Sequence, residues 1–247
     1  MLEVLSTIGL TASASLVIGL LAYAMAQTPR GRLVFAGVLA AWFVLVIAIG
    51  AAGALNPVYG FGVPALGLTV ALPVAALVGA FFASGPIRAA TAATPLPALV
   101  AMNAVRILPG WMFVLLHARG DLPAPFAPSA GWGDIFAGAA ALPLAWSIIR
   151  FGRRVAPLVL AWSVIGIADL VNAIALGALS APGPLQAFAG PPTSAIMTTL
   201  PWLIVPGFLV PILFFIHIVI FARLLAESRA SDAARVWRGA GGQPKSA

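Results

Sequence analysis

Seven long stretches of apolar residues constrain this chain more than any other feature of its sequence. A hydrocarbon core about 30 Å thick requires about 20 apolar residues in a helix that rises 1.5 Å per residue. Turn-forming residues such as Asn56-Pro57 and Ser84-Gly85-Pro86 separate the stretches. We therefore predict an all-α fold, a bundle of seven transmembrane helices over residues 3–26, 33–55, 63–83, 96–117, 131–149, 155–177 and 200–225.

The composition agrees with a polytopic membrane protein. Hydrophobic residues make up 62% of the 247 residues and charged residues 8%, whereas globular domains average about 25% charged residues. This excludes an ordinary soluble domain, a disordered chain and a nucleic-acid partner, and the lipid bilayer is the first expected partner. The chain has no cysteine for a disulfide or a thiolate metal site, and we expect neither a metal nor a cofactor.

The basic residues predict the orientation of the bundle. Arg106 lies within a span and Arg119 follows the fourth span, while the other eleven of the 13 basic residues fall in alternate connections and in the tail. Because Arg and Lys collect in cytoplasmic loops, we expect the N-terminus outside and the C-terminus in the cytoplasm. Glu3, with no basic residue before the first apolar stretch, favours a retained helix over a cleaved signal peptide.

Two parts follow from this layout, a seven-helix transmembrane domain over residues 1–226 and a cytoplasmic polar tail over residues 227–247. Almost all basic residues are arginines, and alanine, glycine and proline are abundant. This usage indicates a GC-rich bacterial genome. We therefore expect a multi-pass protein of the bacterial inner membrane.

Ionisable residues inside a bilayer are costly, so those within the spans are candidates for function. On the fourth span, Asn103, Arg106, Gly110 and His117 fall on one helical face, with Arg106 near the midplane. Pro109 should bend this helix. Gly110 should leave a gap one turn beyond Arg106.

Two aspartates lie at similar depth in the outer half of the bundle, Asp134 on the fifth span and Asp169 on the sixth. The long arginine side chain can extend towards both of them. We predict a polar cluster of Arg106, Asp134, Asp169 and Asn172, with Asn103 below it. One arginine against two aspartates leaves a formal charge of −1, which suits a shared proton or a cationic or hydrogen-bonding ligand.

The predicted cluster leaves several functions open. It would bind or pass a small molecule, a lipid ligand or a proton through an outward-facing pocket, or serve an intramembrane enzyme that acts on a lipid or isoprenoid with the aspartates as acid and base. It would equally fit a structural subunit of a membrane complex, in which buried ion pairs only fix the helix order. The outer connections 119–130 and 178–194 are either solvated loops or lids over the pocket.

The last span contains Pro201, Pro206 and Pro211, which we expect to kink it. His217 should lie in the inner third of this span as a structural hydrogen-bonding residue. His117 should lie at the outer boundary, about 20 Å away along the membrane normal. This separation excludes a haem held by both histidines.

Overall fold

The computed structural model of the chain describes residues 1–188 and 190–239, with the side chains of all of these except Val63 and residues 230–239. Helices account for 81% of the chain and the described residues contain no strand, which confirms the all-α prediction. The long helices are α1 (Leu2–Met25), α2 (Pro29–Ala51), α3 (Gly62–Ala83), α6 (Ile107–Ala118), α7 (Ala127–Phe151), α8 (Ala156–Leu179) and α9 (Val210–Gly239).

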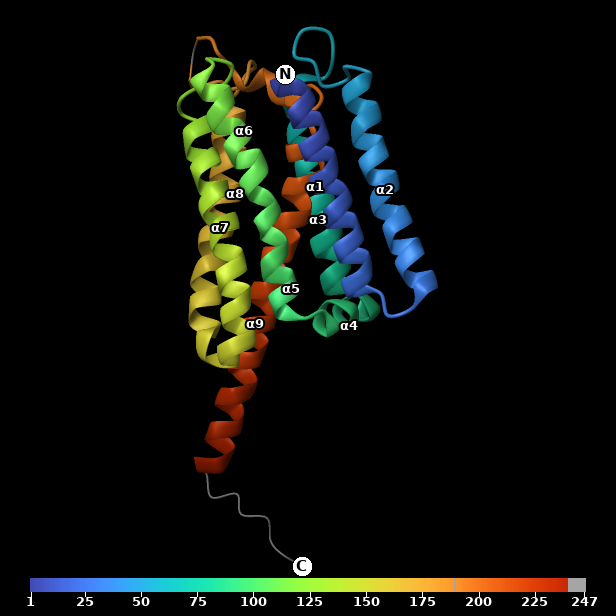
Figure 1. The fold of residues 1–247 in the computed structure, drawn as a ribbon, viewed down its shortest axis with the longest axis vertical. Coiled ribbons are helices and arrows are strands. Elements are labelled where there is room, and N and C mark those ends of the chain that lie inside the picture. The colour runs from blue at the N-terminus through green and yellow to red at the C-terminus, as the bar shows by residue number, and fades with distance from the viewer. Residues whose placement is uncertain (189, 240–247) are drawn as a thin grey trace, which may run out of the picture.

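Six to seven helices are long and apolar enough to cross a membrane. The count has a range because α7 and α8 follow each other within one apolar stretch of 53 residues. Gly152, with a φ of +57° that favours glycine, separates the two helices, and a short 3-10 turn (Gly152–Val155) follows it. Figure 1 shows α7 and α8 side by side and running in opposite directions. The fifth predicted span begins at Ala127 and is longer than expected.

The fourth predicted span consists of three consecutive helical pieces. They are α5 (Leu96–Ala101), the 3-10 turn η1 (Met102–Arg106) and α6. Pro109 has no N–H for the carbonyl of Val105, so the regular α-helical pattern is interrupted before it. The structure thus shows a 3-10 turn that ends at Arg106 itself, while the predicted bend at Pro109 stays a prediction.

Two prolines five residues apart shape the start of the last helix. Pro206 and Pro211 have no N–H to donate, and a π-helical segment, η4 (Val205–Leu209), precedes α9. The N–H of Val210 donates to the carbonyl of Val205. α9 then continues through Gly239, into the segment predicted as a polar tail. Residues 240–247 of that predicted tail lie outside the described residues.

A short helix, α4 (Gly85–Ala93), lies where the sequence was expected to form only a turn. The hydroxyl of Ser84 accepts a hydrogen bond from the N–H of Ile87 at 3.4 Å, and Pro86 lies in the first turn. Both are signals of a helix start. The interpretation of Ser84-Gly85-Pro86 as a simple turn was therefore incomplete.

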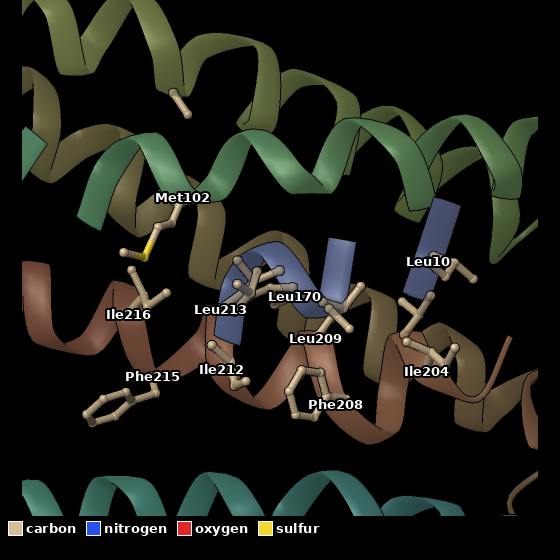
Figure 2. Packing of buried hydrophobic residues seen from close by; sticks show 14 of the residues in the cluster. Leu10, Met102, Leu170, Ile204, Phe208, Leu209, Ile212, Leu213, Phe215 and Ile216 are labelled. Carbon is tan, nitrogen blue, oxygen red and sulfur yellow. The ribbon is translucent and has the colours of Figure 1, made fainter. Parts of the chain in front are cut away.

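The long helices lie along the long axis of the molecule and alternate in direction (Figure 1). We call the end that holds the start of α1 the upper end, as drawn there, and the end where α9 finishes the lower end. α9 packs against α3, α5 and α8, whereas α2 packs mainly against α1. Figure 2 shows the apolar core along α9, where Ile216 faces Met102, and Phe208, Leu170 and Leu10 belong to the same buried cluster.

Candidate functional site

Arg106, at the end of η1, is the centre of a buried polar cluster. Its side chain is fully buried, and its Nε donates to Oδ1 of Asp134 on α7 at 2.7 Å. Its Nη2 donates to Oδ2 of Asp169 on α8. The predicted meeting of one arginine with carboxylates from two other helices is therefore present. Its role as a ligand or proton site stays a prediction.

His217 on α9 is a further hydrogen-bond partner of the Arg106 guanidinium. Its Nε2 lies 3.2 Å from Nη1 of Arg106, which also lies 3.5 Å from the carbonyl of Gly166. Because a guanidinium only donates, Nε2 must accept, and the proton of a neutral imidazole is then on Nδ1. Nδ1 lies 3.1 Å from the hydroxyl of Ser163, which donates in turn to the carbonyl of His217. We call Arg106, Asp134, Asp169, His217 and Ser163 the Arg106 cluster.

The depth predicted for His217 was wrong. It was expected in the inner third of the last span, well below Arg106, yet the two side chains are in contact. The error arises from the bounds of the span, because the apolar helical stretch runs over Val205–Arg229 rather than 200–225. His217 therefore lies at the middle of this stretch. Ser163 was missed because a hydroxyl in an apolar helix gives a weak signal.

Glycines allow the helices to approach closely around the Arg106 cluster. A Cβ at Gly166 would lie 2.4 Å from Cε1 of His217, and one at Gly133 would lie 1.7 Å from Oδ1 of Asp169. On α6, a Cβ at Gly110 would lie 2.7 Å from the carbonyl oxygen of Gly131 on α7. The space predicted at Gly110 is thus filled by the backbone of α7. Small residues at such crossings are typical of packed membrane helices.

The side chains of Asn172 and Asn103, the other two predicted site residues, form their hydrogen bonds with residues other than Arg106. Asn172 donates to the hydroxyl of Ser129 at 2.8 Å, at the partly exposed upper end of α7 and α8. Asn103 is fully buried one turn below Arg106 and donates to the carbonyl of Leu99 at 3.2 Å. Its Oδ1 has no hydrogen-bond partner in the part of the chain that the structure describes. His117 forms a separate hydrogen bond, through Nδ1, with the carbonyl of Leu122 at 3.1 Å.

A cavity of about 240 Å³ borders the Arg106 cluster, and Asp134 forms part of its wall. Asp134 is the one ionisable residue among the described residues that line it. Its Oδ1 is bound to Arg106, while its Oδ2 receives no hydrogen bond within the described part of the chain. The rest of the wall is mainly apolar. Helices contribute Val70 from α3, Leu170 and Ile174 from α8, and Val205 and Pro206 from η4. Connections contribute Phe126 from residues 119–126, and Leu185 and Met197 from the segment that follows α8.

The cavity lies in the upper half of the bundle, and part of its rim is exposed. Ile174 and Leu185 are 37% and 61% exposed, and Phe126 is buried against the cavity. Both connections that were predicted as loops or lids, 119–130 and 178–194, therefore contribute residues to the cavity wall. The π-helical segment η4 forms another part, and such segments recur at functional sites because they displace the following helix.

The Arg106 cluster carries a formal charge of −1, from one guanidinium, two carboxylates and a neutral imidazole. The side chains of Asp134 and Asp169 are each about one tenth exposed, whereas Arg106 is not exposed at all. Within the described residues, no group of three His, Asp or Glu side chains is placed to hold a metal ion. The open oxygen of Asp134 suits a hydrogen-bond donor or a cation that enters the cavity.

Residues 63–225, about two thirds of the chain, match the protein family described as Domain of unknown function (DUF8737). The chain therefore belongs to this family. No curated protein and no solved structure matches it. The matched segment contains every residue of the Arg106 cluster and every residue named above from the cavity wall.

Proposed function

We propose that this family member spans a bacterial inner membrane seven times, with its N-terminus outside and its C-terminus in the cytoplasm. The distribution of basic residues supports this orientation. Arg30 in the first turn of α2, Arg88 in α4 and Arg153 in the turn between α7 and α8 lie at the lower end of the bundle, as do the basic residues of α9. Arg119 lies at the upper end and pairs with Asp121 at 3.1 Å. Excess positive charge on one side marks the cytoplasmic face.

In this membrane the protein binds a small, largely apolar ligand that carries a cationic or hydrogen-bond-donating group. The observation that carries the proposal is the carboxylate of Asp134 in the wall of an otherwise mainly apolar cavity, with one oxygen held by Arg106 and the other without a donor among the described residues. Arg106 balances the charge of only one of the two carboxylates that it contacts, and a net negative charge beside an apolar cavity is unfavourable unless it is paired. A ligand cation would pair with it, and the apolar wall would bury the rest of the ligand.

Binding fits the geometry better than passage across the membrane or acid–base catalysis. Below the Arg106 cluster, the core contains fully or almost fully buried apolar residues, among them Leu99, Val159 and Ile220. A polar route to the lower end would have to pass these side chains. Catalysis by two carboxylates requires both to reach the ligand, but Asp169 is not among the described residues that line the cavity. We therefore assign Asp169 to the anchoring of Arg106.

The test is a binding measurement on the full chain in phosphatidylcholine nanodiscs. The probes are n-hexylammonium and n-hexanol, which differ in charge but little in shape. We expect the ammonium to bind, and Asp134→Asn to weaken its binding at least about tenfold, because a charge-assisted hydrogen bond is lost. Binding of hexanol should change little. The asparagine keeps an oxygen for Arg106, so the fold should persist, which circular dichroism checks.

Asp121→Asn is the matched control, because Asp121 is an exposed carboxylate at the same end of the bundle and outside the cavity. It should leave the affinity for hexylammonium unchanged. The proposal is wrong if the ammonium does not bind, or if Asp121→Asn and Asp134→Asn weaken its binding equally.

A further inference from the structure

A second hollow lies on the surface of the bundle, away from the Arg106 cluster. It is a groove of about 770 Å³ between α1 and the run of α5, η1 and α6. Apolar side chains line it, among them Leu16 and Leu20 of α1, Val105 of η1 and Leu108 of α6. Leu16 and Leu20 are 52% and 40% exposed. This groove would therefore face the hydrocarbon of the bilayer.

Along α1, the groove extends over the lower half of the helix. On α1 its lining runs from Ser13, at the middle of that helix, to Tyr23 and Ala24 at its lower end. Ten residues of helix rise about 15 Å, which is half of a hydrocarbon core of about 30 Å. Along α1 the groove therefore has the depth of about one lipid leaflet, and on the opposite wall it continues up to Trp111 of α6. A transmembrane helix of a second copy would instead need a contact over both leaflets.

A positive charge lies at the lower end of the groove. The guanidinium of Arg32 lies 4.3 Å from the centre of the Tyr23 ring, and its Nε donates to the carbonyl of Ala26 at 3.0 Å. Its two Nη groups have no acceptor among the described residues. Two other arginines of the lower end have acceptors, since Arg88 donates to the carbonyls of Phe81 and Phe82, and Arg223 donates to the carbonyl of Thr94.

We propose that this groove holds an acyl chain of an anionic glycerophospholipid of the lower leaflet, with the lipid phosphate at Arg32. The guanidinium lies over the face of the Tyr23 ring, and tyrosine is a residue that favours the depth of the lipid head groups. The free Nη groups of Arg32 match two phosphate oxygens. Basic residues at the cytoplasmic ends of grooves between membrane helices are a common arrangement for anionic lipids.

The experiment is native mass spectrometry of the full chain in detergent, titrated with dioleoyl phosphatidylglycerol or dioleoyl phosphatidylcholine. We expect the wild type to retain the anionic lipid in preference. Arg32→Gln should reduce that preference about five-fold, the effect of one arginine near a membrane surface. Ala101→Phe, which fills the groove, should reduce retention of both lipids.

Arg154→Gln is the matched control, because Arg154 is an exposed arginine at the same end of the bundle but in the turn between α7 and α8. It should leave the preference intact, and so should Asp134→Asn, which separates this lipid site from the cavity. Equal retention of the two lipids by the wild type would overturn the proposal. An Arg154→Gln effect as large as that of Arg32→Gln would overturn it too, as would a dimer that forms instead of a lipid adduct.

Discussion

The helices around Arg106 and helix α2 belong to one bundle, but different forces hold them there. In the apolar parts of α9 and α2, 61% and 11% of the residues are buried. The Arg106 cluster joins η1, α7, α8 and α9 through ion pairs and hydrogen bonds. α2 instead makes apolar contacts, such as those of Trp42 and Phe43 with Phe208. Apolar contacts gain little in a bilayer, because lipid chains replace them well.

The comparison predicts that Arg106→Leu has the largest effect on stability of any single change. It leaves the carboxylates of Asp134 and Asp169 buried without their partner, which costs about 3–5 kcal/mol. Thermal unfolding in detergent measures the loss. Arg30→Leu, at the exposed start of α2, is the control and should change the unfolding temperature little.

A rescue experiment separates a charge effect from a packing effect. Adding Asp134→Asn and Asp169→Asn to Arg106→Leu removes the unpaired charges and should recover much of the stability. A triple variant as unstable as Arg106→Leu alone would mean that the shape of the arginine, and not its charge, holds the helices together.

Close helix contacts should give the second largest effect. Gly166→Ala places a methyl group 2.4 Å from Cε1 of His217, so α8 and α9 must separate, at a cost of about 1–3 kcal/mol. Gly37→Ala on α2 is the matched control, since nothing lies within 4 Å of the added group. Chemical denaturation of both variants gives the comparison, and equal stability of the two would contradict it.

The large-scale fold could be predicted from the sequence because the bilayer imposes a length on each helix. The all-helical fold and the meeting of Arg106 with Asp134 and Asp169 followed from apolar stretches and from helical spacing. These features depend on a single helix and its depth. The helix α4 was missed although Ser84 and Pro86 signalled it, because a short interfacial helix carries no apolar stretch of the required length.

Features that depend on how two helices are offset could not be predicted from the sequence. The contact of His217 with Arg106 depends on where α9 begins, and the prolines shift that start to the π-helical segment at Val205. The cavity beside Asp134 depends on the gap between α3 and α8, which no single helix encodes. Asn172 was predicted in the cluster together with Asp169, but its side chain donates to the hydroxyl of Ser129 instead.

His217→Leu tests whether the imidazole supports Arg106 or only fills space. The leucine fills a similar volume but removes the imidazole acceptor for Nη1 of Arg106. Nη1 would still have the carbonyl of Gly166 as an acceptor. The loss of one net hydrogen bond costs about 1 kcal/mol. Phe43→Leu on α2, which removes a ring contact with Phe208, should cost less in the same thermal unfolding assay. The reverse order would mean that apolar contacts dominate both regions.

Asn172→Ala should have the smallest effect. Asn172 belongs to α8 and was predicted in the cluster, yet its hydrogen bond to Ser129 lies at the partly exposed upper end. Hydrogen bonds between membrane helices contribute about 0.6 kcal/mol on average, so this variant should unfold within a few degrees of the wild type and bind hexylammonium as tightly. A loss comparable to that of His217→Leu would extend the Arg106 cluster to the upper end of α8. All of α8 would then belong to the strongly held region, whereas we expect the strongly held part of α8 to end above Asp169.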